Sequence, residues 1–303
     1  MSEPLQSPPA RNPGVDVVVV SYNSREQLRG CVQPLASVPG VAVVVVDNAS
    51  QDGSAAALAD LPVTVIPLEH NGGFAHGCNV GWRAGSAEYV LFLNPDARLD
   101  AESLAHLAAV LDGSGSVGIV GPRIMASDGA LDFSQRRFPR LRSTFAHALF
   151  LNRAFPRSQW ASEMVRDPAA YERPASPEWI SGACMLVRRS LLERVGGWDE
   201  EFFLYCEDKD LCFAARAAGY DVRFEPSAIA VHQGGASSNS TLMPVLAASR
   251  IRYAEKHQGR TVAWLERVGV GLTALTHILV TRGGMAVRSG HAASLRAVAS
   301  RRP

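Results

Sequence analysis

The stretch VDVVVVSYNS, residues 15–24, combines the pattern of a buried strand with a polar end. A continuous β-branched run such as 15–20 is typical of a strand that is covered on both faces. Polar side chains follow it directly, at Ser21, Tyr22, Asn23 and Ser24. Because parallel α/β sheets bind ligands beyond the carboxyl ends of their strands, this stretch indicates both a fold class and the edge of the sheet where a site would lie.

The same pattern recurs through the first 120 residues. Apolar strands are predicted at 41–46, 62–68, 89–93 and 117–121, and helices at 24–37, 54–60, 75–86 and 100–111. Non-alternating strands separated by helices predict an α/β fold, with a Rossmann-like, mostly parallel sheet that helices cover on both faces. Residues 113–118 fit the dinucleotide pattern G-x-G-x-x-G, but they follow a helix and lead into a strand, which argues against a dehydrogenase.

Polar clusters follow two more of these strands, and a glycine-rich loop follows another. Strand 41–46 ends in DNASQDG (47–53), and LFLNPDARLD (91–100) runs into Asn94, Pro95 and Asp96. The loop HNGGFAHGCNVG (70–81) opens a helix, and its glycines let backbone N–H groups approach an anion. Polar residues at four strand ends on one edge are more than helix capping explains, so we expect a nucleotide site there.

Composition describes a globular chain with balanced charge. The 303 residues are 47% hydrophobic and carry a net charge of +1, so a sizeable core can form and nothing favours a nucleic-acid partner. Five cysteines without a CxxC pair indicate free thiols in a reducing cytoplasm. Residues 1–14 are polar and proline-rich, which predicts a disordered leader and not a secretory signal.

The second half has a more mixed pattern. A hairpin is predicted over 123–137 with its turn at Asp128-Gly129, and a strand and a helix are predicted at 181–187 and 188–197. Residues 138–178 hold five prolines and several arginines without a clear period. Such a span is usually a binding segment or a mobile one.

Three acids, Glu207, Asp208 and Asp210, fall in the first turn of a helix predicted to begin near Glu207. Acids in a first turn are common, because they complement the helix dipole. Here the apolar run FFLY (202–205) precedes them and would place them against a dry wall, where a general base can be tuned.

His232 ends the predicted strand 227–232 and is followed by a Gly/Ser stretch, 233–238. Taken alone, a histidine in this position is more often a rim residue than a ligand. The stretch behind it is a candidate lid.

Six segments together resemble one family. They are VVVSYNS, VVVDNASQDGS, HNGGFAHGCNVG, LFLNPDARL, ISGACMLVRR and GGWDEEFFLYCEDKDLCFAARAAGYDV, followed by His232. Over roughly residues 15–260 the chain resembles a family 2 glycosyltransferase with the GT-A fold, and within it bacterial dTDP-rhamnosyltransferase-like enzymes. The resemblance implies inverting transfer of a sugar from a nucleoside diphosphate to the hydroxyl of a saccharide or a lipid-linked acceptor. The sugar it favours is L-rhamnose, and the process it implies is cell-envelope glycan synthesis.

The resemblance also implies a division of the chain. A GT-A catalytic domain would span 15–240, with a nucleotide-binding half at 15–121 and an acceptor-binding half at 122–240. C-terminal helices and a basic tail would occupy 241–303.

Carried over residue by residue, the resemblance assigns a dTDP- or UDP-sugar site to Ser21, Asn23, Asp47, Asn71, Gly72, Gly73, Asn94 and Asp96. Asp47 would bind the pyrimidine base. Asp208 would be the general base, with Glu207 and Asp210 as supports. The acceptor or a phosphate would contact Arg136, Arg137, Trp179 and Gly182, although a solvated basic turn is an equal alternative for the two arginines.

The resemblance places a divalent cation, Mn²⁺ or Mg²⁺, at Asp96 and His232. Asn94 replaces the first acid of the family's D-x-D motif, so one motif carboxylate is left. An imidazole ligand would suit Mn²⁺ at least as well as Mg²⁺.

A C-terminal helix is amphipathic. Its apolar residues recur at spacings of three and four, at Trp264, Leu265, Val268, Leu272, Leu275 and Leu279, and from Thr281 onward there are five arginines and no acid. Two interpretations stay open. The helix would lie on the anionic inner face of the cell membrane, near a polyprenyl-diphosphate-linked acceptor, or it would pack on the domain or on a second copy in a homodimer.

Rival functions differ in specific features. A nucleotidyltransferase on a similar sheet would have a glycine-rich loop, followed by Arg and Lys, after the first strand. This chain has SYNSREQL there, which argues against that class. A non-catalytic sugar-nucleotide-binding scaffold would explain Asn94 but not the retained Glu207, Asp208 and His232. A GT-A enzyme with another donor (galactofuranose, mannose or GlcNAc) also remains an alternative.

Overall fold

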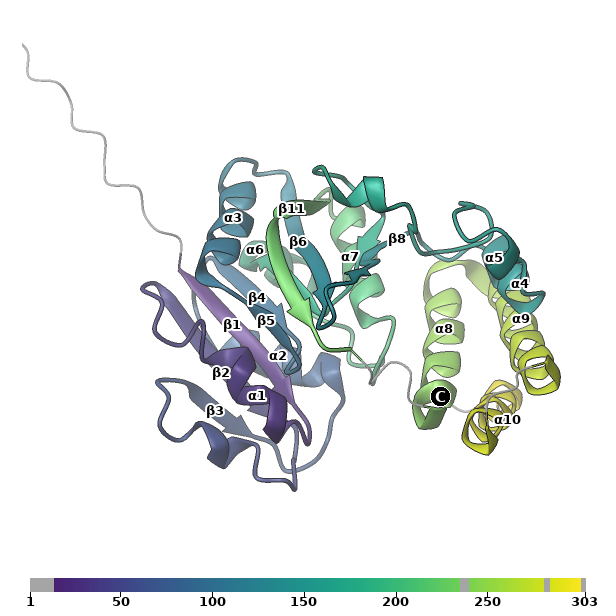
Figure 1. Cartoon of the computed structure of the whole chain (residues 1–303), viewed down its shortest axis with the longest axis horizontal. Coiled ribbons are helices and arrows are strands. Elements are labelled where there is room, and N and C mark those ends of the chain that lie inside the picture. The colour runs from purple at the N-terminus through teal and green to yellow at the C-terminus, as the bar shows by residue number, and fades with distance from the viewer. Residues whose placement is uncertain (1–13, 235–239, 281–283, 301–303) are drawn as a thin grey trace, which may run out of the picture.

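The computed structural model describes residues 14–234, 240–280 and 284–300 (Figure 1). Three predicted segments lie wholly or partly outside the described residues: the leader except for Gly14, most of the candidate lid, and part of the basic tail.

One mixed sheet forms the centre of the molecule, in the order β3-β2-β1-β4-β10-β6-β11-β5, with β7 paired to β6. Its strands are β1 Val15–Ser21, β2 Val41–Asp47, β3 Thr64–Pro67, β4 Tyr89–Leu93, β5 Ala97–Leu99, β6 Val117–Ala126, β7 Leu131–Asp132, β10 Cys184–Arg188 and β11 Asp221–His232. The first four and the β6–β11 pair are parallel, whereas β10 runs antiparallel between β4 and β6. The prediction of a mostly parallel sheet is confirmed.

The valine run of β1 is apolar throughout because both faces of the sheet carry a core. Val17 and Val19 join one buried cluster, whereas Val18 and Val20 join another on the opposite face. Helices α1 Arg25–Val32 and α3 Ala101–Asp112 cover the first face.

The second face is covered by α2 Phe74–Ala84, α6 Arg189–Val195 and α7 Glu207–Ala217. The helix expected at 54–60 is only a single 3₁₀ turn, η1 Ala55–Leu58.

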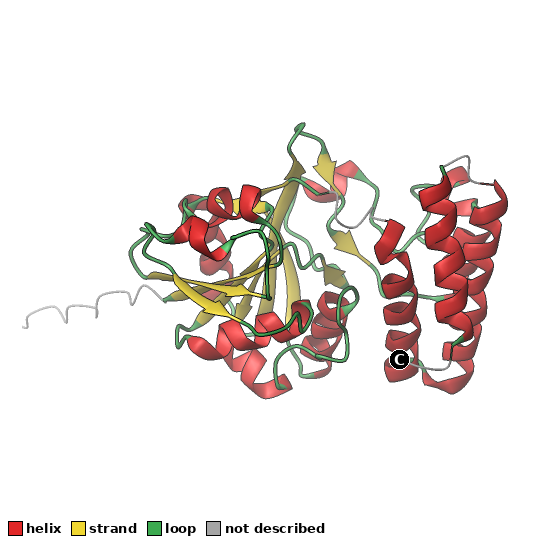
Figure 2. Cartoon of the chain, turned by 90° about the horizontal axis from the view of Figure 1, so that it is seen from below, coloured by secondary structure: helices red, strands yellow, loops and turns green. Residues whose placement is uncertain are grey.

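A layer of helices lies beside the sheet (Figure 2). It consists of α8 Met243–His257, α9 Gly259–Val280 and α10 Met285–Ala299, together with α4 Leu141–Ala148 and α5 Leu151–Ala154. Helix α4 packs against α9, so the 138–178 span is less irregular than its sequence indicates. Its buried residues are Ser143, Thr144, Ala146 and Ala148. The helix has only eight residues, fewer than the roughly 11–18 over which a hydrophobic period is recognised, which explains why the pattern missed it.

Candidate active site

The end of β2 and the glycine-rich loop are joined by Asn48. Its Nδ2 donates to Oδ1 of Asn71 (2.8 Å) and to the carbonyl of Gly73 (3.1 Å), and its Oδ1 accepts the N–H of Gly72 (3.0 Å). The structure therefore brings three predicted nucleotide residues together through a fourth that was not singled out. Its place in DNASQDG was the available signal.

Gly73 is fixed by both its conformation and its neighbours. Its φ is +89°, and a Cβ there would overlap the carbonyl oxygen of Phe203. That same carbonyl accepts the N–H of Phe74 (2.8 Å). Only glycine satisfies both conditions, so the loop lies directly against the 202–205 segment.

The other predicted nucleotide residues lie at the ends of β1 and β2. The hydroxyls of Ser21 and Ser24 are 2.7 Å apart, Asn23 Oδ1 accepts the N–H of Gln51 (2.8 Å), and Asp47 Oδ1 accepts the N–H of Ser50 (3.1 Å). Five described non-glycine residues have positive φ, and four of them lie in these loops or just before α7: Asn23, Ala49, Tyr205 and Cys206. Backbone strain of this kind concentrates at functional sites.

Asp96 and His232 are brought together by strand pairing. In the antiparallel β5–β11 ladder, Ala97 lies opposite His232, so the preceding Asp96 faces the imidazole. His232 Nε2 lies 3.2 Å from Asp96 Oδ1, and its Nδ1 lies 3.8 Å from Oδ2 of Asp132. Burial alone would lower the pKa of His232, but the two carboxylates outweigh it and raise the pKa to about 9.

Asp132 was not predicted from the sequence. It lies in β7, the second strand of the hairpin that turns at Asp128-Gly129, and this strand pairs with β6. Asp132 comes near His232 because β6, which carries the hairpin, pairs with the distant β11. No local pattern could therefore have identified it.

The candidate base, Asp208, is held close to the motif Asn94. The N–H of Asn94 donates to the carbonyl of Ala183 (2.9 Å), and the neighbouring Gly182 donates its N–H to Asp208 Oδ2 (2.9 Å). The N–H of Lys209 donates to the other carboxylate oxygen (2.7 Å). The connection between β9 Trp179–Ile180 and β10 therefore links the D-x-D position to the start of α7.

The three acids of α7 point to different surroundings. Asp210 contacts Lys256 Nζ (2.9 Å) and His257 Nε2 (2.6 Å) of α8, so it joins α7 to the helical layer. Glu207 is buried, its Oε2 has no hydrogen-bond partner among the described residues, and burial together with Asp208 raises its pKa well above the usual range.

Asp208 differs from Glu207 in its hydrogen bonds. Burial raises the pKa of Asp208 too, but the two N–H donors oppose the rise. Asp208 is also the only one of the three acids that is not fully buried. These surroundings favour a neutral Glu207 beside an ionised Asp208, which is how paired carboxyl groups divide acid and base roles.

Arg136 and Arg137 have different contacts. In the small sheet of β8 Gln135–Arg136 and β9 Trp179–Ile180, Arg136 lies over the Trp179 ring (5.7 Å to its centroid). Its charge also opposes the rise that burial causes in the pKa of Asp208, and it adds to the effect of His232 in lowering the pKa of Asp132. Arg137 donates instead to the carbonyl of Met164 (3.5 Å). Only Arg136 therefore acts electrostatically on both of these site acids.

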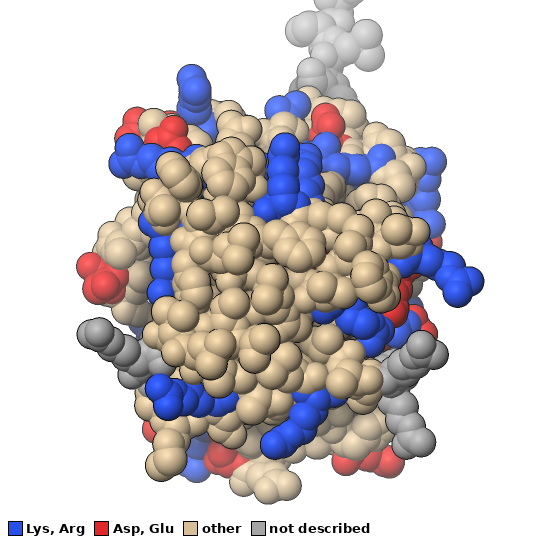
Figure 3. All heavy atoms as spheres, turned by 90° about the vertical axis from the view of Figure 1, so that its right-hand side faces the viewer, with Lys and Arg blue, Asp and Glu red and all other residues tan. Residues whose placement is uncertain are grey.

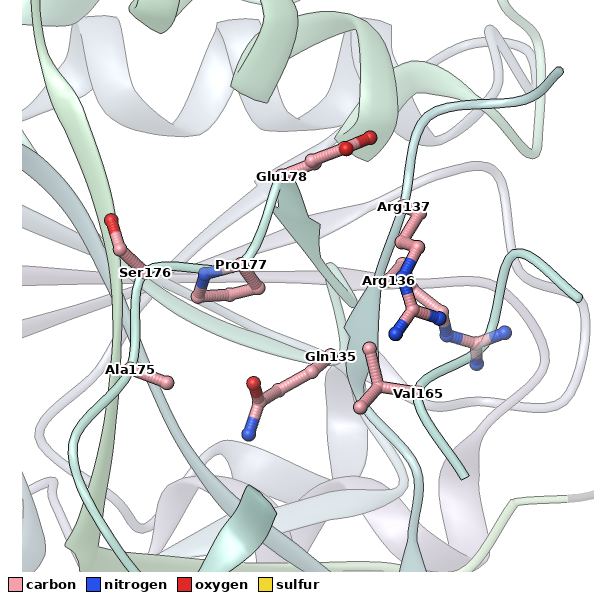
Figure 4. Close-up of a pocket in the computed structure, with 8 residues that line it drawn as sticks. All are labelled: Gln135, Arg136, Arg137, Val165, Ala175, Ser176, Pro177 and Glu178. Atoms are coloured by element: carbon pink, nitrogen blue, oxygen red, sulfur yellow. The ribbon is translucent and has the colours of Figure 1, made fainter. Parts of the chain in front are cut away.

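A cavity of about 230 Å³ lies beside these two arginines. Figure 4 shows Ala175, Ser176 and Pro177 on one side of it and Arg136, Arg137 and Val165 on the other. Its lining includes none of the acids at the strand ends.

Fold and site together define a GT-A glycosyltransferase. Residues 16–196 match the family described as glycosyl transferase family 2, and the chain belongs to that family. It is 32% identical over 289 residues to the N-acetylglucosaminyl-diphospho-decaprenol L-rhamnosyltransferase of Mycobacterium tuberculosis, covering 89% of this chain and 93% of that protein. It is 30% identical over 172 residues to rhamnosyltransferase WbbL of Escherichia coli K12, covering 53% and 60%.

Solved structures share the fold. The mannosyltransferase PcManGT from Pyrobaculum calidifontis, in complex with GDP-Man and Mn²⁺, superposes with a TM-score of 0.58 at 19% identity, covering 96% of this chain and 87% of that one. Residues 1–349 of S. aureus TarS in complex with UDP-GlcNAc give a TM-score of 0.51 at 18% identity, covering 94% and 89%.

The donor set at Asp96 and His232 fits a divalent cation. Among the described residues, no three His, Cys, Asp or Glu side chains are grouped to hold a metal. Asp96 and His232 form a pair of candidate ligands, with 3.2 Å between Asp96 Oδ1 and His232 Nε2. Neighbouring ligands of an octahedral ion with bonds of about 2.1 Å would lie roughly 3 Å apart, which is close to that distance. Diphosphate oxygens and water would supply the remaining ligands.

Proposed function

We propose that this glycosyltransferase moves L-rhamnose from dTDP-L-rhamnose to a hydroxyl of a saccharide carried on a polyprenyl diphosphate. The observation that carries the proposal is the similarity, over nearly the whole of both chains, to an enzyme named for an N-acetylglucosaminyl-diphospho-decaprenol acceptor and an L-rhamnosyl group. A nucleotide-sugar donor is a cytoplasmic substrate. The five cysteines, all free and buried, agree with that compartment.

In this proposal Asp208 is the general base. A carboxylate oxygen of ionised Asp208 takes the proton of the acceptor hydroxyl while the hydroxyl oxygen bonds to the anomeric carbon of the donor sugar. In the same step the bond from this carbon to the diphosphate breaks, the diphosphate leaves with the electron pair, and the configuration at the carbon inverts. The N–H groups of Gly182 and Lys209 orient the carboxylate, and the neutral Glu207 adds no competing charge.

The leaving diphosphate gains negative charge. A divalent ion held by Asp96 and His232 would neutralise that charge. We assign the donor to the ends of β1 and β2 and to the 71–73 loop, where Asn48 connects the strand end to the loop. Arg136, stacked on Trp179, is the candidate contact for an anionic group on either substrate.

The proposal is tested with the purified full chain and four donors: dTDP-L-rhamnose, UDP-galactofuranose, GDP-mannose and UDP-GlcNAc. The acceptor is a short-chain GlcNAc-diphospho-polyprenol, and the product is weighed by mass spectrometry. We expect transfer from dTDP-L-rhamnose alone, in the presence of Mn²⁺. Transfer from another donor overturns the rhamnose assignment. Thermal stabilisation by a donor without any transfer favours a sugar-nucleotide-binding scaffold.

A further inference from the structure

Helix α9 carries large apolar side chains on its outward side, in addition to the residues that it buries on its inward side. Its inward side carries Ala263, Val270 and Ala274, all buried. Outward, Trp264 is 61% exposed and Leu279 is 73% exposed. The outward side of a surface helix is usually polar, yet only 33% of the most apolar 18-residue window of α9 is buried.

The exposed apolar surface continues onto the neighbouring helices. Exposed large side chains near α9 are Val268, Leu275 and Val280 on the helix itself, Leu149, Phe155 and Trp160 after α4 and α5, and Met285 at the start of α10. Figure 3 shows this side of the molecule as a broad uncharged area, with Lys and Arg and some Asp and Glu around its edge. We call Trp264, Val268, Leu275 and Leu279 the outer face. Contiguous apolar patches of this kind mark docking sites.

Within the two chain segments that form most of this side, 141–162 and 259–299, the exposed charge has one sign. Segments 141–162 and 259–299 contain a single acid, Glu266, and it is buried. The same segments carry six exposed arginines: Arg142, Arg153, Arg157, Arg260, Arg288 and Arg296. Exposed arginines beside an apolar area are complementary to an anionic lipid surface, which attracts cations near it.

The inward side of α9 fixes its orientation. Glu266 contacts Arg250 (2.8 Å), Arg250 contacts Glu163 (2.8 Å), and Glu163 Oε2 lies 3.5 Å from Nζ of Lys209, the residue after Asp208. An acid engaged in such a network, together with packing on α4, α8 and α10, does not suit a helix that spans a bilayer. It suits a helix that lies in the plane of the interface.

We propose that the outer face docks on the surface of an anionic lipid bilayer, with α9 parallel to the membrane plane and the exposed arginines contacting lipid headgroups. The proposal deepens the proposed function and rests on it only for the reason to approach a lipid-linked acceptor. A symmetric contact with a second copy is less suitable, because it would bring the exposed arginines of both copies together.

Vesicle flotation of the full chain tests the proposal without turnover. The probes are vesicles of phosphatidylcholine alone and of phosphatidylcholine with phosphatidylglycerol. We expect binding to the anionic vesicles that weakens with salt, and at least tenfold weaker binding of the double variant W264S/L279S. Replacing Arg288 and Arg296 with Gln should weaken binding to anionic vesicles, whereas Arg173→Gln, outside both segments, should not.

Folding and activity separate the outcomes. The double variant should keep the wild-type circular dichroism spectrum and its rate with a water-soluble acceptor analogue. Wild-type protein that fails to float with anionic vesicles, or a double variant that floats equally well, overturns the proposal. A concentration-dependent dimer that the double variant dissociates, without vesicle binding, assigns the face to a second copy instead. Vesicle binding without rhamnose transfer would contradict the proposed function only.

Discussion

Two neighbouring carboxyl groups, Glu207 and Asp208, differ in their hydrogen bonds, and this difference gives the first prediction. Asp208→Asn should lower kcat by roughly 10²–10⁴, since proton transfer is lost. Donor affinity, measured by calorimetry, should stay within a few fold of wild type. The Asp208 carboxylate accepts hydrogen bonds from the N–H groups of Gly182 and Lys209, and it is not one of the residues assigned to the donor. Retention of more than a tenth of wild-type activity would show that Asp208 is not the base.

The pH profile tests the same residue independently. Burial raises the pKa of Asp208, and the group acts as a base only when ionised. The rate constant kcat/KM should therefore fall as the pH drops through a value above the usual carboxylate pKa of about 3.9. An acid limb at or below that ordinary value would contradict the assignment.

Asp132 gives a prediction about metal affinity. A carboxylate behind a metal-binding histidine orients the ring, and its loss commonly costs about 10–100-fold in affinity. Asp132→Asn should weaken Mn²⁺ binding by that amount, because Asp132 Oδ2 faces His232 Nδ1 at 3.8 Å. Mn²⁺ binding is followed by electron paramagnetic resonance without substrate. Asp128→Asn, in the turn of the same hairpin, is the control, and equal effects of the two changes would exclude an orienting role.

Among the structural elements, the glycine-rich loop gives the next prediction. Gly73→Ala should weaken nucleotide binding and lower the free energy of unfolding, because the new Cβ meets Phe203 in addition to the unfavourable φ of +89°. Gly129→Ala is a matched control, since Gly129 has a φ of +81° with nothing within 4 Å of an added Cβ. Chemical denaturation and dTDP titration measure both variants. If Gly129→Ala is as harmful as Gly73→Ala, contact with Phe203 plays no part.

The elements also show how far the sequence can predict this molecule. Continuous valine runs predict β1 and β2, and their polar ends predict the edge of the site, because both signals are local. The antiparallel β10 reaches its place by pairing with β4, and Asp132 comes near His232 because β6, which carries the hairpin, pairs with β11. Neither pairing lies within one window of sequence. Helix α4 was missed for a different reason, since its eight residues are fewer than the roughly 11–18 over which a hydrophobic period is recognised.

At the scale of the whole molecule, one buried charge network joins the sheet domain to the helical layer. Lys209 is buried, with its Nζ 5.2 Å from the Trp179 ring centroid and 5.1 Å from that of Tyr253, and its carboxylate neighbour is Glu163. Glu163 also contacts Arg250 (2.8 Å). Replacing Glu163 with Gln leaves two cations without their shared anion, which typically costs about 3–5 kcal/mol of stability.

Acid titration should reveal the same network. Burial alone would raise the pKa of Glu163, but Arg250 and Lys209 outweigh it and lower the pKa to about 2, below the ordinary value of 4.5. A depressed folded-state pKa means that this stabilisation is complete above pH 4.5 and is lost as the pH falls toward 2. Urea unfolding between pH 7 and pH 3 should therefore show a large gap between wild type and Glu163→Gln at pH 7 that narrows in acid. Glu255→Gln, which removes an exposed pair with Arg267, should cost at most about 1 kcal/mol. A gap that stays constant with pH would mean that Glu163 acts through packing and not through its charge.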